Sequence, residues 1–177
     1  MTYYNFNTAE SNNYDLIPKG TIAKVRMQIQ RGGLNDDEHG WTEGYATGSD
    51  LTGAVYLNCE YTILSGEYKG RKIWSTIGLY SSKNDNIWGD IGRSFIRSIL
   101  NSRSGFTDKD DSPEATVARQ IESFAELDGC EFVARVDVEN DEAYGKKNVI
   151  KAAITPEHKQ YNAAMDKASV KLMDWTV

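Results

Sequence analysis

The sequence predicts a mainly β protein with a helical insert, and three observations support this fold class. Residues 54–80 contain two strands joined by a short glycine-bounded turn, because apolar and polar residues alternate on both sides of it. Residues 21–31 alternate in the same way and predict an earlier strand. Residues 88–104 carry apolar side chains at helical spacing, and two further alternating runs, 132–138 and 148–155, come after them.

The order is therefore three strands, a helical insert and two strands, which is the order of the five-stranded oligonucleotide/oligosaccharide-binding (OB) barrel. We expect this OB-fold domain at residues 19–156, between an N-terminal arm at 1–18 and a C-terminal tail at 157–177. Residues 32–53 contain six glycines and predict a long loop or an irregular hairpin.

Each predicted strand has an apolar face, which we expect to be buried, and a polar face, because successive side chains of a strand point to opposite sides. In the first three strands the buried faces are made of aliphatic residues together with one cysteine and one tyrosine. These residues are Ala23, Val25, Met27, Ile29, Val55, Leu57, Cys59, Tyr61, Ile63, Ile73, Ile77 and Leu79.

The insert predicts two helices. In the first, Ile91, Phe95 and Ile99 are spaced to form one buried stripe. The second is expected to begin with Ser112 as N-cap and Pro113 in the first turn. Its buried side is expected to be Ala118, Ile121, Phe124 and Ala125.

The polar face of the second and third strands is unusual, because it combines aromatic rings with amides and a cation. It carries Tyr56 and Asn58 on one strand, and Lys72, Trp74, Thr76 and Tyr80 on the next. Exposed rings among cations are a poor core but a good platform on which the bases of a single strand can stack.

The charge distribution permits a nucleic-acid partner although the chain of 177 residues has a net charge of −6. Positive and negative residues cancel in residues 1–104, and the excess of acids lies in residues 105–177. Between Gly66 and Arg103 seven cations face three acids. Because a local potential follows the nearby charges, a positive surface can exist on an acidic protein.

Four segments resemble a family of small phage and prophage proteins that carries a domain-of-unknown-function label. They are GEYKGRKIW, WGDIGRSFIRSILNS, ELDGCEFVARVDVEND and GKKNVIKAAITP, and the similarity runs from about Pro18 to Pro156. Members pair a G-x-Y-x-G-R hairpin with a later N-x-I-K strand. The resemblance implies a barrel fold and a role near phage replication or recombination, with similarity to single-stranded DNA-binding proteins. It implies no catalytic residues.

We therefore predict a sequence-tolerant single-stranded DNA-binding protein that acts in phage DNA replication or recombination. Cations would contact phosphates and rings would stack on bases. The main candidates are Lys24, Arg26, Tyr56, Arg71, Lys72, Trp74 and Tyr80. Arg93 and Arg97 on the helix, and Tyr144, Lys146 and Lys147 in the turn between the last two strands, are secondary candidates.

Two alternatives remain open at this stage. The rings of Trp74 and Tyr80 could cover a second small core, and the cations could belong to ordinary solvated faces. The same aromatic surface could also bind a protein, which would make the chain a protein-interaction or virion-associated barrel that does not bind nucleic acid.

The sequence does not predict an enzyme, a cofactor or a metal site. His39 and His158 have no metal-ligand spacing, and the acids beside His39 fit a solvated loop better than a cation site. The segment GDIGRS lacks the lysine of a phosphate-binding P-loop. Cys59 and Cys130 are expected to be free, buried thiols.

The N-terminus has neither basic residues nor an apolar stretch, so we expect no secretory signal and a cytoplasmic location, the host cytoplasm if a phage encodes the chain. No segment is apolar enough to predict a membrane partner. The last residues, 172–177, could recruit a replication or recombination protein, and the sequence leaves a homo-oligomer open.

Overall fold

The computed structural model describes residues 3–9 and 15–165. Its strands are β1 (Ile22–Gln30), β2 (Leu34–Asp36), β3 (Trp41–Gly48), β4 (Val55–Ile63), β5 (Lys72–Tyr80), β6 (Glu131–Asp141) and β7 (Gly145–Ala153). The helices are α1 (Ile87–Ser104) and α2 (Pro113–Ala118), with short 3₁₀ turns at Asp37–His39, Asn84–Asn86 and Phe124–Glu126. Residues 161–165 are also helical.

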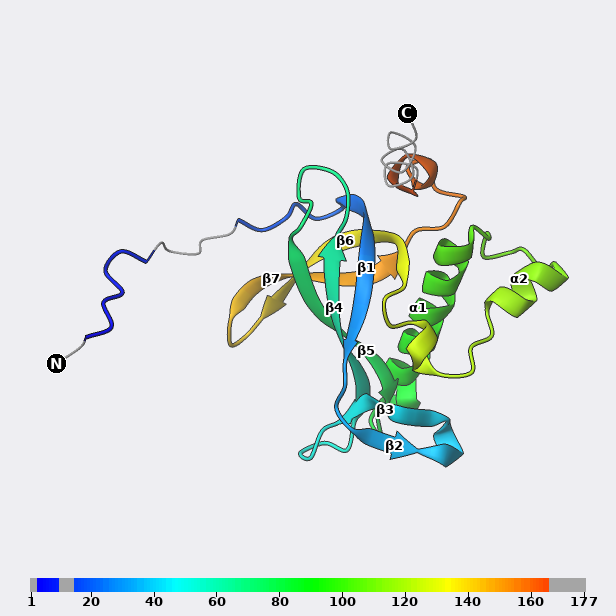
Figure 1. The fold of residues 1–177 in the computed structure, drawn as a ribbon. Helices are drawn as coiled ribbons and strands as arrows, with labels where there is room; N and C mark the ends of the chain where they lie inside the picture. The colour runs from blue at the N-terminus through cyan, green and yellow to red at the C-terminus, as the bar shows by residue number, and fades with distance from the viewer. Residues whose placement is uncertain (1–2, 10–14, 166–177) are drawn as a thin grey trace.

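The strands form one curled antiparallel sheet, so the fold is mainly β, as the sequence predicts (Figure 1). The strand order is β2-β3-β4-β1-β6-β7, and β5 also pairs with β4. The sheet curls until β5 and β7 lie next to each other, where the Ser75 hydroxyl donates a hydrogen bond of 3.1 Å to the Ile150 carbonyl. The result is a half-barrel with one main helix, α1, packed against β5, β6 and β7.

The core fills the inside of this half-barrel, and the predicted apolar faces of β1, β4 and β5 form most of it. Of the residues expected to be buried there, only Leu79 keeps partial exposure. Aromatic rings join the sheet to the helix, because Phe132 makes edge-on contacts with both Tyr61 and Phe95. Burial of these aliphatic and aromatic side chains supplies the main favourable free energy of folding.

The ends of the expected domain are held to it. Ile17, from the predicted arm, is fully buried, and its backbone exchanges hydrogen bonds of 2.9 Å with the side chain of Asn148. At the other end Tyr161, from the predicted tail, is buried against Val133, and its hydroxyl donates to the Ser102 carbonyl at 2.6 Å. Residues 166–177 of the tail, which include the recruitment segment 172–177, lie outside the described residues.

The helical insert differs from the prediction in which side of α1 is buried. Phe95 and Ile99 are buried as expected, but Ile91 is 61% exposed. The reason is close packing by glycine: a Cβ on Gly92 would overlap the carbonyl oxygen of Gly78 in β5. The helix turns its glycines to the sheet, and Ile91 consequently faces outward.

The second helix begins as predicted, because the Ser112 hydroxyl accepts a hydrogen bond from the Ala115 amide. It is shorter than predicted, however, and ends at Ala118. Ala115 is its buried residue, and Ala125, which was expected to be buried, is exposed. With only six residues the helix has little surface to bury, so a 3₁₀ turn carries the chain back to the sheet.

One further feature of the strands agrees with the sequence-based description, and one corrects it. Residues 32–53 form the β2-β3 hairpin, which agrees with the hairpin alternative and extends the sheet at β4. Lys146 and Lys147 lie in β7, not in the turn before it, because β6 and β7 pair as far as Asp141 and Gly145. Among the described residues, no helix is long and apolar enough to cross a membrane.

Candidate nucleic-acid interface

The polar sides of β1, β4 and β5 form one continuous outward surface, as the sequence predicts. The three strands are adjacent, and their registers align side chains in rows across the sheet. Because β4 pairs with β1 on one side and with β5 on the other, each row contains one residue from each of these three strands. The rows are Arg26, Thr62 and Lys72; Gln28, Glu60 and Trp74; and Gln30, Asn58 and Thr76.

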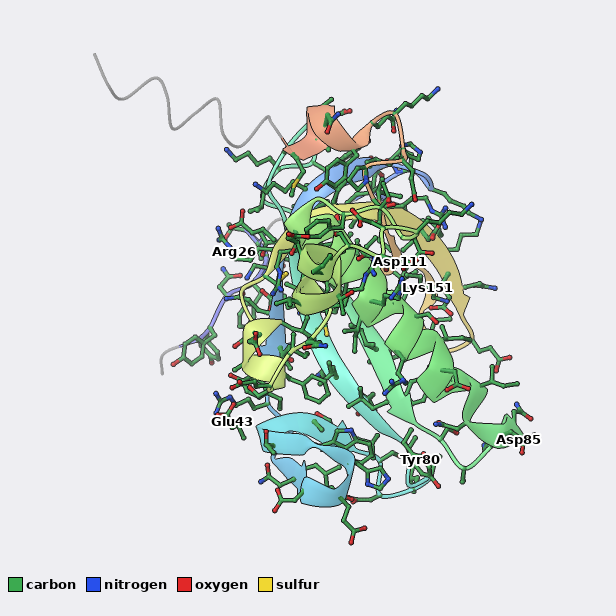
Figure 2. All side chains as sticks on the ribbon, turned by 90° about the vertical axis from the view of Figure 1, so that its right-hand side faces the viewer. Arg26, Glu43, Tyr80, Asp85, Asp111 and Lys151 are labelled. Carbon is green, nitrogen blue, oxygen red and sulfur yellow. The ribbon has the colours of Figure 1, made fainter. Side chains whose placement is uncertain are left out.

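Aromatic rings gather on the β4-β5 part of this surface and remain open to solvent. Trp74 is 54% exposed and Tyr80 is 37% exposed, so neither ring is sealed in a second core. Tyr56 is half-buried and lies opposite Gly78 of β5. Figure 2 shows Tyr80 at the end of the sheet next to the β2-β3 hairpin.

Trp88, for which the sequence predicts only a position at the start of a helix, completes this group. A Cβ on Gly78 would lie 2.5 Å from the Trp88 ring, so the indole lies directly over the glycine. The centroids of the Trp88 and Tyr56 rings are 6.3 Å apart. The sequence does contain a signal for this contact, since Trp88 follows shortly after a strand that contains Gly78. The contact can be predicted only when the register of that strand is known. We call Tyr56, Trp74, Tyr80 and Trp88 the aromatic face.

The turn before α1 fixes the position of Trp88. Asn84, Asp85 and Asn86 have φ angles of 51°, 52° and 63°, a left-handed conformation that asparagine and aspartate tolerate better than most residues. The Asn86 side chain also accepts a hydrogen bond of 2.8 Å from the Ser81 amide. These contacts bring α1 back over β5 immediately after the strand ends.

A groove of about 320 Å³ runs beside the aromatic face. Trp74 and Trp88 line it on the β5 and α1 side, and Lys147 and Lys151 line it on the β7 side. Its other lining residues are Asn58, Ser75, Thr76, Glu139 and Val149. Two indoles facing two lysines across a groove can stack on bases and contact phosphates at the same time.

Glu60 orders the centre of this surface. Its carboxylate accepts a hydrogen bond of 3.3 Å from the Trp74 indole and forms an ion pair of 2.7 Å with Lys72. The hydrogen bond from Lys72 holds the pKa of the Glu60 carboxyl below its usual value. Trp74 is thus oriented before any ligand arrives, but at the cost of a negative charge on the surface.

Most of the predicted phosphate-binding cations are paired with acids. Lys24 and Arg26 both contact Glu131, at 3.4 and 3.0 Å, and the Lys24 side chain is only 14% exposed. Burial acts to raise the pKa of Glu131, but the Arg26 hydrogen bond and the two positive charges outweigh it, and the pKa is lowered. At the groove Lys147 is 3.5 Å from Asp141.

The remaining candidates lie away from the groove. Arg71 donates to the backbone carbonyl of Asp15 at 3.0 Å, and Arg97 is paired with Asp108 at 3.1 Å. Tyr144 is 88% exposed at the tip of the β6-β7 hairpin. The groove does not include Arg93 or Lys146 among its lining residues.

The acidic stretch near His39 has a structural role. The Asp36 side chain caps the 3₁₀ turn by accepting hydrogen bonds from the Glu38 and His39 amides, and its other oxygen lies 2.9 Å from the His39 ring. The hydrogen bond with His39 lowers the pKa of Asp36. Within residues 3–9 and 15–165, no group of three or more His, Cys, Asp or Glu side chains is arranged to hold a metal ion.

No protein-family model matches the chain, and neither a curated protein nor a solved structure shows significant similarity to it. The resemblance to the phage and prophage family therefore stays a prediction.

Proposed function

We propose that the protein is a sequence-tolerant single-stranded DNA-binding protein with an OB-type barrel. The observation that carries the proposal is the groove between the exposed indoles of Trp74 and Trp88 and the amines of Lys147 and Lys151. Stacking on aromatic rings is tolerant of sequence because every base has a π-face, and each stacked base contributes about 1–3 kcal/mol.

The topology supports the OB assignment. In chain order β1, β4, β5, β6 and β7 correspond to the five strands of that barrel, with α1 between the third and the fourth. The pairings β1-β4, β4-β5, β1-β6 and β6-β7 follow the OB order, and β5 approaches β7 at Ser75 and Ile150. The proposed groove lies between β5 and β7 and touches β4 at Asn58, so it borders the β4-β5 surface, which corresponds to the ligand-binding face of OB folds.

A place in phage DNA replication or recombination belongs to the same proposal, and only the family resemblance supports it. It does not follow from the groove, which would suit any process that exposes single-stranded DNA.

The second candidate is a protein-interaction barrel that uses the same aromatic face. The observation in its favour is that the cations of the face are already paired, Lys72 with Glu60 and Lys151 with Glu139 at 2.9 Å. Exposed ion pairs are weak, about 0–1 kcal/mol, so phosphates can compete for these amines. This competition is why we place the DNA-binding proposal first.

Titration of a fluorescent oligo-dT of about 15 nucleotides, a length within the range that one OB fold covers, tests the proposal. Binding should be measured at about 50 and about 200 mM salt, since release of counterions makes phosphate contacts salt-dependent. We expect saturable binding, quenching of tryptophan emission and a marked loss of affinity at the higher salt. A protein-interaction barrel would give no binding at either salt concentration.

A further inference from the structure

A second pocket lies on the other side of α1 from the groove. It has a volume of about 610 Å³, is partly open to solvent and is bordered by α1, the start of β3 and the segment that follows α2. This volume falls within the range of about 300–1,000 Å³ that is typical of small-molecule sites. None of the predicted stacking residues lines it.

Three guanidinium groups line this pocket, from Arg93, Arg97 and Arg119, and none of the described residues that line it is acidic. This is unexpected in a chain with a net charge of −6. Arg93 and Arg97 are four residues apart on α1 and therefore share a helix face. Arg119 comes from the chain just after α2, so two separate segments direct positive charge into one space.

Two of the guanidinium groups are fixed in place and still have donors free. Arg119 donates from Nε to the buried Asn101 side chain at 2.7 Å and from Nη2 to the Thr107 carbonyl at 3.0 Å. Arg97 uses Nε and Nη2 on Asp108. A guanidinium has five N–H donors, and no Nη1 hydrogen bond joins either arginine to a described residue, so each can donate from Nη1 to a ligand. Preorganised donors lose little entropy when they bind an anion.

Arg93 is different, because it is exposed and its side chain makes no hydrogen bond or ion pair with any of the described residues. The three guanidinium charges outnumber the two carboxylates that interact with them, Asp108 with Arg97 and Asp110 with Arg119, so the pocket keeps a positive balance. A phosphomonoester carries about −1.5 to −2 charges near neutral pH and accepts paired N–H donors from arginine. The opposite wall is apolar and includes Leu79 and Phe124.

We propose that this pocket is a second ligand site that binds a phosphomonoester attached to an apolar or flat body, such as a nucleotide. The phosphate would contact the three arginines and the body would lie against Leu79 and Phe124. Two sources share this chemistry: a free mononucleotide and the 5′-phosphorylated end of a DNA strand. The site is separate from the proposed groove and does not depend on it.

Calorimetric titration of the full chain with dTMP and with thymidine tests this site, and titration with 5′-phosphoryl and 5′-hydroxyl oligo-dT distinguishes the two sources. We expect the phosphorylated member of at least one pair to bind at least about tenfold more tightly, which is the effect of roughly one charge-assisted hydrogen bond. Preference for dTMP identifies a free nucleotide, and preference for the 5′-phosphoryl oligonucleotide identifies a strand end.

The variant Arg93→Ala should remove most of this preference. Because Arg93 has no partner among the described residues, its loss should leave the fold intact, which circular dichroism can verify. Lys19→Ala is the matched control, since it removes one exposed positive charge near the β6 and β7 side of the molecule. The proposal is overturned if phosphorylation gives no advantage in either pair, or if Arg93→Ala and Lys19→Ala behave alike. Failure of both oligonucleotides to bind, with dTMP still bound, would reject the proposed groove and leave this pocket supported.

Discussion

Trp74 is the residue on which the proposed groove depends most. It is exposed, it is held by Glu60, and it faces Lys147 and Lys151 across the groove. Replacing Trp74 by alanine should weaken oligo-dT binding by about 1–3 kcal/mol, because one stacking platform is lost. Fluorescence anisotropy with labelled oligo-dT measures the change.

The matched control is Tyr144→Ala, which removes another exposed ring at a hairpin tip outside the groove. Its affinity should stay close to that of the unmodified protein. Equal losses in both variants would show that exposed rings contribute without regard to position, which contradicts a defined groove.

Replacing Glu60 should strengthen oligo-dT binding, whereas replacing Trp74 should weaken it. The variant Glu60→Gln keeps an oxygen that can accept from the Trp74 indole, but it removes the negative charge and releases Lys72. DNA binding should become tighter by roughly two- to fivefold, which is the scale of one exposed ion pair. The same titration measures this gain, and a weaker complex would argue against phosphates near Lys72.

Cys59 gives a pH-dependent prediction for stability. Burial raises the pKa of its thiol to about 12, compared with 9.0 for a free thiol. The folded state thus disfavours the thiolate, so its stability should be intact below pH 9 and should fall as the pH rises from there toward 12. Urea denaturation at increasing alkaline pH measures the fall.

Cys59→Ala should lose less stability as the pH rises above 9, because position 59 then has no thiol to ionise. The variant itself should be less stable at neutral pH, because the substitution leaves a cavity. In the native protein at pH 8 neither buried thiol should react with a disulfide reagent, whereas both should react in denaturant. Rapid labelling of Cys59 without denaturant would contradict its burial.

At the scale of elements, the contact between α1 and β5 is made by glycines. Gly92 lies against the Gly78 carbonyl, and the Trp88 ring covers Gly78 itself. The variant Gly92→Ala should destabilise the protein by about 1–3 kcal/mol, because added methyl groups in a tight contact force backbone shifts. This cost should exceed the gain of up to about 1 kcal/mol that alanine offers in a helix.

Chemical denaturation measures the effect, with Ser94→Ala as the control at an exposed position of the same helix. Gly92→Ala should also displace Trp88 and shift its emission. A Gly92→Ala protein as stable as the unmodified one would mean that the helix does not approach the strand this closely.

How well the sequence predicts which side chains are buried differs from element to element. Alternation in β1, β4 and β5 was sufficient to identify their buried faces, because those strands face the core on one side only. Ile91 was assigned wrongly because apolar spacing does not reveal that glycine makes the closest contact. Val133 alternates with the core residues Phe132 and Ala134, yet it is fully buried as well, because the segment around Tyr161 covers the other side of β6.

The candidate site was predictable in part for the same reason. Tyr56, Trp74 and Tyr80 follow from strand alternation, so their common face could be read from the sequence. The proximity of Trp88 and Lys151 to Trp74, and the pairing of Lys72 with Glu60, depend on strand register and on how the sheet curls. Neither feature is encoded in local spacing.

At the scale of the whole molecule, the half-barrel keeps two surfaces apart. The aromatic face lies on the outward side of β4 and β5, together with Trp88 of α1. The pocket lined by Arg93, Arg97 and Arg119 lies on the other side of α1. Acidic residues pair with the cations beside the aromatic face as well, Lys72 with Glu60, Lys147 with Asp141 and Lys151 with Glu139. Such a protein should bind DNA weakly by charge alone, and stacking should supply most of the affinity.

The most direct test is the response of the tryptophan indole N–H signals to a 5′-hydroxyl oligo-dT in ¹H–¹⁵N correlation spectra, each assigned with a Trp→Phe variant. We predict that the Trp74 and Trp88 signals shift in a saturable manner, whereas the signal of the buried Trp41 does not. Unchanged Trp74 and Trp88 signals at saturating oligonucleotide would contradict DNA binding at this groove.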